Sequence, residues 1–164
     1  MERYLRLVSA GSNSTQPQQL HSSFGSDPTS TLRFVWSTVN ATPSSEVRYG
    51  VSGGPMTEVA SGNSTFFDQP AQFIHHVNLS GLVANTAYDY VVGSSVGGWS
   101  NKTTITTAPE TGTKEADDFV FAVYGDMGLD NERSLPRLIA DVDSGRINAV
   151  LHVGDLAYNL DTDK

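Results

Sequence analysis

Two short segments near the end of the chain place a glycine and an aspartate directly after an apolar run. Residues 125–128 (Gly-Asp-Met-Gly) follow the apolar run 119–124, and residues 154–158 (Gly-Asp-Leu-Ala-Tyr) follow the apolar run 149–153. Short apolar runs bounded by glycine are typical of buried β-strands. The segment between them, about 134–143, is predicted to be a helix. The predicted order is therefore strand, Asp loop, helix, strand, Asp loop.

This order predicts that Asp126 and Asp155 lie close together. Two parallel strands deliver the residues at their carboxyl ends to the same edge of a sheet, where open α/β folds bind their ligands. Two adjacent carboxylates repel unless a cation lies between them. We therefore predict a site for two metal ions at this edge. The alternative is that both aspartates only turn the chain after a strand.

The preceding residues have the pattern of an all-β domain. Short segments rich in Thr, Val and Tyr recur between turn residues, which is typical of a β-sandwich. We predict a loose segment over residues 1–17, the sandwich over 18–108, a polar linker over 109–118 and the start of an α/β domain over 119–164. The predicted strands of the sandwich are 32–36, 46–51, 73–79, 87–93 and 103–107.

Residues 79–88 of the predicted sandwich are similar to the tyrosine-corner region of fibronectin type III-like domains. In such a corner a tyrosine hydroxyl bonds back to nearby backbone. Leu82 would enter the core and Tyr88 would form the corner.

Charge and composition exclude several classes of function. The net charge of −8 argues against the backbone of a nucleic acid or an anionic membrane as the main partner. The chain has no cysteine, which excludes disulfides, thiolate metal sites and cysteine nucleophiles. No apolar stretch approaches the roughly 20 residues that a membrane-spanning helix needs.

Five Asn-x-Ser/Thr sequons lie before the predicted domain boundary and favour a secreted or extracellular glycoprotein, a lysosomal one being the alternative. The first residues lack the apolar core of a signal peptide, so we expect the N-terminus to be incomplete. The candidate glycosylation sites are Asn13, Asn40, Asn63, Asn78 and Asn101.

The two Gly-Asp segments match the first two signature motifs of the purple acid phosphatases, GDxG and GDxxY, in spacing, in order and in following a β-sandwich. The chain resembles this family from about residue 16 to residue 164, and the run 123–161 is most similar to the animal long-form enzymes of the calcineurin-like metallophosphoesterase superfamily. The resemblance implies hydrolysis of phosphate monoesters at acidic pH. It also implies that the protein can form a homodimer.

The resemblance also implies the metal ligands. Asp126 would bind a ferric ion, Asp155 would bridge two metals, and Tyr158 would bind the ferric ion as a tyrosinate. The cofactors would be Fe(III) and a divalent metal, either Zn, Fe or Mn. Ferric ion prefers carboxylate and phenolate oxygens, and a strong Lewis acid is needed to ionise a tyrosine, whose ordinary pKa is about 10.

The histidines of this chain do not complete that ligand set. The family also uses an Asn-His motif, a distal His motif and a Gly-His-x-His motif, and none has a match here. We expect His75 and His76 to point to opposite faces of a strand and to be structural, and His152 to be a packed, hydrogen-bonded core residue. The chain is therefore expected to be an incomplete fragment with little activity alone. Two alternatives remain open: a non-catalytic isoform acting as a β-sandwich binding module, and a related metallophosphodiesterase without a tyrosinate.

Overall fold

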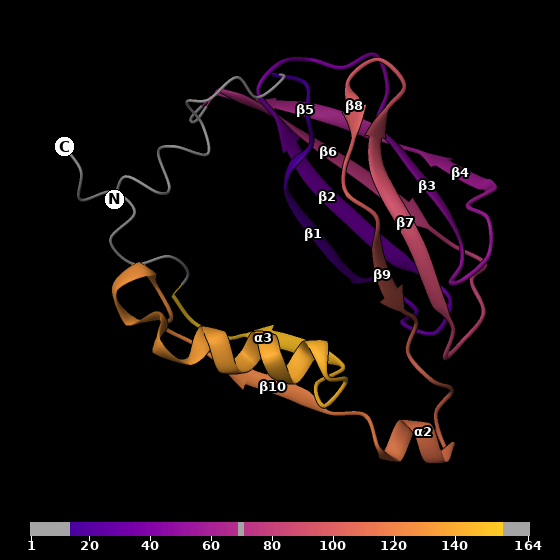
Figure 1. Ribbon diagram of the computed structural model, residues 1–164, viewed down its shortest axis with the longest axis vertical. Helices are drawn as coiled ribbons and strands as arrows, with labels where there is room; N and C mark the ends of the chain where they lie inside the picture. The colour runs from indigo at the N-terminus through magenta and orange to yellow at the C-terminus, as the bar shows by residue number, and fades with distance from the viewer. Residues whose placement is uncertain (1–13, 69–70, 156–164) are drawn as a thin grey trace. The chain divides into compact units, whose positions relative to one another are not determined.

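The computed structural model describes residues 14–68 and 71–155, and for residues 129–131 it describes the backbone alone. The chain divides into two compact units, Met1–Thr111 and Gly112–Lys164. Strands β1 to β9 belong to the first unit, and α2 to β11 belong to the second (Figure 1). Within the described residues, no helix is long and apolar enough to cross a membrane.

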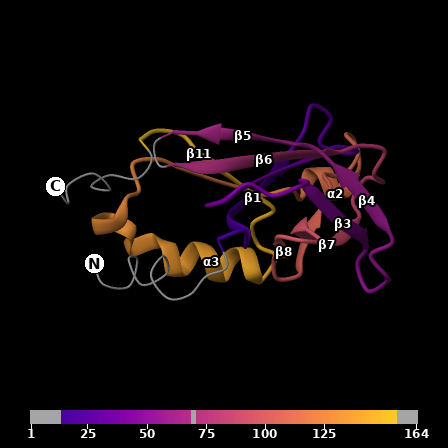
Figure 2. The ribbon, with the colours of Figure 1, turned by 90° about the horizontal axis from the view of Figure 1, so that it is seen from above.

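The first unit consists of two antiparallel sheets, which Figure 2 shows from above. The predicted strands are confirmed to within two residues at each end. The strands that the sequence analysis missed are short or carry few apolar residues, so they give a weak alternation signal. One sheet has the order β1 (Gln18–Phe24), β2 (Leu32–Thr38), β6 (Gln72–Leu79), β5 (Asn63–Phe67); the other has β4 (Glu58–Ser61), β3 (Glu46–Val51), β7 (Ala87–Ser94), β8 (Gly98–Trp99), with β9 (Thr103–Thr106) also paired to β7.

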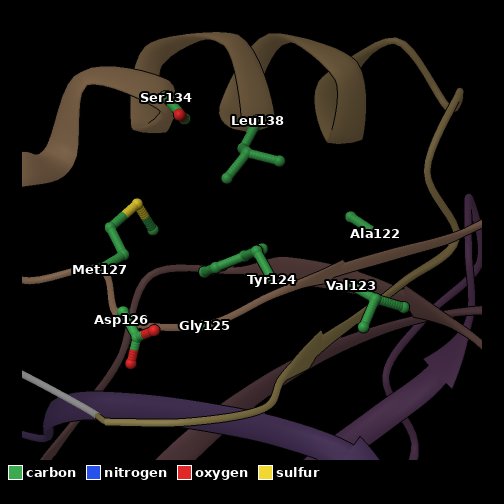
Figure 3. A pocket seen from close by; sticks show the side chains of 8 residues that line it. All are labelled: Ala122, Val123, Tyr124, Gly125, Asp126, Met127, Ser134 and Leu138. Atoms are coloured by element: carbon green, nitrogen blue, oxygen red, sulfur yellow. The ribbon is translucent and has the colours of Figure 1, made fainter.

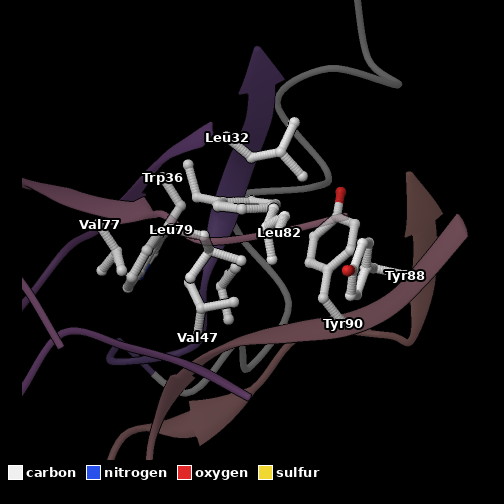
Figure 4. Close-up of a cluster of buried hydrophobic side chains, with 10 residues drawn as sticks. Leu32, Trp36, Val47, Val77, Leu79, Leu82, Tyr88 and Tyr90 are labelled. Atoms are coloured by element: carbon white, nitrogen blue, oxygen red, sulfur yellow. The ribbon is translucent and has the colours of Figure 1, made fainter. Parts of the chain in front are cut away.

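The inward-facing residues of both sheets form one apolar core (Figure 4). Phe34 and Trp36 of β2 meet Val47 of β3 and Val92 of β7, and each is at most 1% exposed. Complete burial of such side chains contributes roughly 1.5–3 kcal/mol each. Two antiparallel sheets that share one core are consistent with the predicted β-sandwich.

The tyrosine corner is confirmed at Tyr88. Its hydroxyl accepts a hydrogen bond of 3.0 Å from the backbone N–H of Val83, five residues upstream. Leu82 is buried in the core, as predicted. The bond ties the segment before β7 to the strand itself.

His75 is buried within the sandwich, whereas its neighbour His76 is exposed on the other face of β6, as predicted. Its ring is stacked on Trp36, with centroids 5.0 Å apart, and both ring nitrogens are bonded. Nε2 lies 2.8 Å from Thr38 Oγ1, and Nδ1 lies 2.8 Å from Ser45 Oγ. Burial lowers the pKa of His75, and the nearby His76 lowers it further. His75 is thus a structural residue that joins β2 and β6 to the segment before β3.

Asp89 on β7 gathers polar groups from three parts of the sandwich. Its carboxylate accepts hydrogen bonds from Thr104 Oγ1 (2.6 Å), Ser52 Oγ (2.8 Å) and Lys102 Nζ (3.0 Å). The hydrogen bond from Thr104 contributes most to lowering the pKa of Asp89 well below its usual range, and those from Lys102 and Ser52 add to it. The carboxylate is 5% exposed, so these donors replace the water that it would otherwise bind.

The second unit contains the predicted strand, helix and strand. Strands β10 (Phe121–Tyr124) and β11 (Ala149–His152) pair in parallel, and η1 (Leu129–Ser134) and α3 (Leu135–Asp143) lie between them in sequence. A short helix, α2 (Lys114–Asp117), lies in the segment that was predicted to be a plain linker.

The prediction that β10 and β11 are buried strands is wrong for this chain. Their apolar side chains are substantially exposed, including Phe121 at 49% and Val123 at 60%. A two-stranded sheet in a unit of this size has too few neighbouring elements to cover both of its faces.

Candidate metal site at the ends of β10 and β11

The two Gly-Asp loops begin side by side because their strands are in parallel register. Tyr124, the last residue of β10, is paired with His152, the last residue of β11. The backbone N–H of Val153 then donates a hydrogen bond of 2.7 Å to the carbonyl oxygen of Tyr124, which extends the pairing beyond the strands. The next residues on the two strands are Gly125 and Gly154.

Glycine is required at Gly125 because the two backbones approach closely. A Cβ atom at this position would lie 2.5 Å from the carbonyl oxygen of Val153, a distance that real Cβ atoms do not adopt. No side chain could stand there without moving β11 away. The glycine of the first motif therefore determines how near the two loops can come.

The carboxylate of Asp126 lies against the second loop. Asp126 has a φ of +57°, in the left-handed region that costs most residues about 1 kcal/mol or more. In this conformation its Oδ1 atom lies 3.4 Å from the position of a Cβ atom on Gly154, which itself has a φ of +128°. With Asp126 in this backbone conformation, its carboxylate lies beside the loop that carries Asp155.

A pocket of about 480 Å³ lies between β10 with its following loop and the residues Ser134 and Leu138 at the start of α3 (Figure 3). Leu138 projects from α3 toward Tyr124, while the carboxylate of Asp126 points away from the helix. The pocket is lined by Ala122, Val123, Tyr124, Gly125, Asp126, Met127, Ser134 and Leu138.

His152 is packed as predicted, but the predicted hydrogen bonding is not found at its Nε2 atom. Its ring lies 4.9 Å from the ring of Tyr124. Its Nε2 atom is buried and has no hydrogen-bond partner among the described residues. An unpaired buried nitrogen of this kind costs about 1–3 kcal/mol. The sequence pattern alone could not show which polar group faces this nitrogen.

The structure describes only two of the three predicted metal ligands. Asp126 and the loop of Asp155 are adjacent, and Asp155 is exposed. Tyr158 lies outside the described residues. Within the described part of the chain, no group of three or more His, Cys, Asp or Glu side chains is placed to hold a metal ion. The structural role of Gly125 and Gly154 was not predicted from the sequence. A glycine directly after each of the two strands was the signal that could have indicated it.

The candidate glycosylation sites lie on the surface where the structure describes them. Asn40, Asn63, Asn78 and Asn101 are all exposed, and Asn13 lies outside the described residues.

Comparison with known proteins assigns the sandwich to a family. Residues 17–107 match the family described as "Purple acid Phosphatase, N-terminal domain", which is more than half of the chain. The chain belongs to the purple acid phosphatase family. This assignment confirms the resemblance that the two Gly-Asp motifs and the preceding sandwich indicated.

Curated relatives within and around this family extend the similarity through both units. The chain is 39% identical to "Acid phosphatase type 7" of Mus musculus over 90% of its length, and 38% identical to that of Homo sapiens over 94%. It is 29% identical to "Fe(3+)-Zn(2+) purple acid phosphatase 12" of Arabidopsis thaliana over 92% of its length. The matches cover only 34%, 35% and 32% of these relatives, so the chain spans about a third of their length.

Proposed function

We propose that this chain is the N-terminal part of a metal-dependent acid phosphatase that hydrolyses phosphate monoesters. The observation that carries the proposal is the convergence of the two Gly-Asp loops at the ends of β10 and β11, with Asp126 Oδ1 beside Gly154. Ligands of open α/β sheets bind at this edge. The relatives are named as acid phosphatases, which supports the same reaction class.

The residues present fit a dinuclear metal centre. Gly154 leaves open the space beside the Asp126 carboxylate that a Cβ atom would fill, and the loop of Asp155 passes that space. Asp126 would hold the ferric ion, Asp155 would bridge it to a divalent ion (Zn, Fe or Mn), and Tyr158 would bind the ferric ion as phenolate. When bound, such a centre would polarise phosphoryl oxygens and lower the pKa of water so that it can act as the nucleophile. The work of the chain's own residues is to hold the two carboxylates at a fixed separation.

Three oxygen ligands are too few to close a site for two metals. We propose that the remaining ligands come from residues outside this sequence, as the family motifs imply. This chain alone would then bind metal weakly and release little or no phosphate. Activity of the 164-residue chain at the level of a complete enzyme would contradict this part of the proposal.

The same proposal covers the cellular context. The protein is proposed to be secreted or lysosomal and to carry N-linked glycans on some of its exposed sequons. Its partner is a phosphate monoester, with neither nucleic acid nor membrane as a main partner, and the full-length protein is proposed to assemble as a homodimer.

The test uses the full-length protein isolated from its source. Phosphate release from a monoester, metal content and visible absorption are measured for Asp126→Asn, Asp155→Asn and Tyr158→Phe. We expect the aspartate variants to lose bound metal and activity, and Tyr158→Phe to lose the charge-transfer absorption. Asp117→Asn on α2, an exposed carboxylate outside the two loops, is the matched control and should retain all three properties.

The outcomes separate this proposal from its alternatives. A colourless protein that cleaves diesters would indicate a related metallophosphodiesterase. A full-length protein that binds no metal in the wild type, while its sandwich unfolds cooperatively, would indicate a binding module without catalysis.

A further inference from the structure

Strand β5 is an open edge of its sheet. It is the last strand in the order β1-β2-β6-β5, and all five of its residues, Asn63–Phe67, are exposed. Phe66 and Phe67 are 52% and 57% exposed. Neither β5 nor its partner β6 contains Asp, Glu, Lys or Arg. An exposed, uncharged edge strand that also presents two aromatic side chains is a template for pairing with another chain.

The other strand edges of the sandwich carry their own protection. The register of β1 shifts between Gln18 and His21, and Gln19 there has a φ of +52°, so this edge is irregular. Strand β4 has four residues and begins with Glu58, β9 has four residues, and β8 has only two. Irregularity, shortness and charge are the usual means by which edges avoid association. Strand β5 has five residues in regular register with β6, and none of the five is charged.

What β5 does have is a sequon that begins at its first residue. Asn63 is followed by Ser64 and Thr65, and Asn63 lies opposite the exposed His76 of β6. Ser64 lies opposite the buried His75, so Asn63 projects from the outer face of the sheet at its open edge. Phe67 shares this outer face, because it lies four residues from Asn63 on the same strand.

We propose that Asn63 carries an N-linked glycan that prevents β5 from pairing with the edge of another sheet. In the modification, the Nδ2 atom of Asn63 forms a bond to the anomeric carbon of an oligosaccharide carried on a polyprenyl pyrophosphate. The bond from that carbon to the pyrophosphate breaks, the pyrophosphate leaves as an anion, and the amide nitrogen loses a proton. A branched, hydrated sugar at the start of the strand then occupies the space that an incoming strand would need.

This inference rests on passage through a secretory compartment, which is part of the proposed function, and not on phosphatase activity. The whole 164-residue chain is therefore expressed behind a heterologous leader in a eukaryotic secretory host. Occupancy is measured by mass spectrometry after enzymatic release of glycans, which converts a modified Asn to Asp. We expect Asn63 to be modified, and an unmodified Asn63 would overturn the proposal whatever the protein's enzymatic activity.

The protective role is tested by self-association. Asn63→Gln and Thr65→Ala both remove the sequon, but only the first changes the asparagine. We expect both to lose one glycan and to form oligomers in size-exclusion chromatography at concentrations where the unaltered chain is monomeric. If a variant is retained in the cell as aggregates, this counts as self-association, provided that adding Phe67→Lys restores its secretion.

A charge on the same edge should replace the glycan. Phe67→Lys, at a side chain that is already more than half exposed, should return Asn63→Gln to the monomer. Asn101→Gln, at an exposed sequon in the loop before β9, is the matched control and should stay monomeric. Monomeric Asn63→Gln and Thr65→Ala, failure of the rescue, or equal association of Asn101→Gln would each overturn the proposed role.

Discussion

The carboxylate of Asp126 lies beside the backbone of Gly154 in the neighbouring loop: its Oδ1 atom is 3.4 Å from the position that a Cβ atom on Gly154 would occupy. Both residues have a positive φ, +57° for Asp126 and +128° for Gly154. A Cβ atom on Gly154 would therefore be in van der Waals contact with the Asp126 carboxylate, at a backbone φ that side chains rarely adopt. This proximity connects the geometry of the backbone directly to the proposed metal site.

Replacing Gly154 by alanine should weaken metal binding. The substitution would place a side chain at a φ of +128°, which side chains rarely adopt, and its methyl group would contact the Asp126 carboxylate, so any shift of the backbone would displace that carboxylate. In the full-length protein we expect Gly154→Ala to lower metal content after dialysis and to weaken the visible absorption.

Gly145→Ala is the control for this substitution. Gly145 also has a positive φ, +73°, but open space surrounds the position of its Cβ atom. It should cost about 1 kcal/mol of stability and leave metal content unchanged. Equal metal loss in both variants would show that backbone strain in general, and not the contact with Asp126, is responsible.

Tyr88→Phe should destabilise the sandwich by about 1–2 kcal/mol. The substitution removes the hydroxyl that accepts the N–H of Val83 and leaves the buried ring in place. Urea unfolding followed by tryptophan fluorescence measures the change, since Trp36 lies in the same core. Tyr49→Phe removes a phenolic hydroxyl outside the corner and should cost less; equal losses would argue against a special role for the corner.

The stability of the sandwich should fall as the pH drops below about 6.5, the ordinary pKa of histidine. Burial lowers the pKa of His75 in the folded state, so the unfolded chain takes up its proton at a higher pH than the folded chain does. The contribution of His75 is complete above the unfolded pKa and is lost as the pH falls from there toward the folded pKa.

The side chains that contact the ring of His75 are uncharged: Trp36, Thr38 and Ser45, with Ser64 opposite on β5. Thr38 Oγ1 also bonds to the carbonyl oxygen of Asn40, so it donates there and accepts from Nε2–H, which leaves Nδ1 to accept from Ser45. The neutral ring satisfies this chain of hydrogen bonds and the imidazolium does not.

Denaturant unfolding from about pH 7.5 to about pH 5 measures this effect. His75→Gln should be less stable at neutral pH and should lose much of the pH dependence. His76→Gln removes the exposed neighbour, which also contributes to the shift, and should retain most of the dependence. A wild type whose stability is constant across this range would contradict the prediction.

Asp89→Asn should destabilise the sandwich more than Lys102→Met does. Asp89 receives hydrogen bonds from three side chains, whereas the Lys102 side chain is 61% exposed, and an exposed ion pair contributes little. Because the pKa of Asp89 is lowered in the folded state, its contribution is present above the unfolded pKa of about 3.8 and is lost only in stronger acid. Melting temperatures of the two variants at neutral pH provide the comparison, and a larger loss in Lys102→Met would contradict it.

Much of the fold follows from local patterns in the sequence. The alternation in β3 set its bounds at Glu46–Val51, and the Leu82 to Tyr88 spacing predicted the tyrosine corner. The apolar runs before Asp126 and Asp155 predicted two parallel strands with a helix between them in sequence. These features are encoded over a few residues, since strand and helix periodicity and turn chemistry are short-range properties.

Other features depend on contacts between residues far apart in the sequence, and only the tertiary structure decided them. The bonds from His75 to Thr38 and Ser45 span 37 and 30 residues, and the approach of Asp126 to Gly154 depends on the register of β10 with β11. The exposure of Phe121 and Val123 could likewise not be predicted from the apolar run that contains them, because burial depends on which elements cover a face of the sheet. The sequence by itself determined which residues could form strands and the tyrosine corner, and its assignment of Asp126, Asp155 and Tyr158 as metal ligands stays a prediction. Their distances, their burial and the open edge at β5 were decided by the pairing of strands, since pairing is what places distant residues side by side.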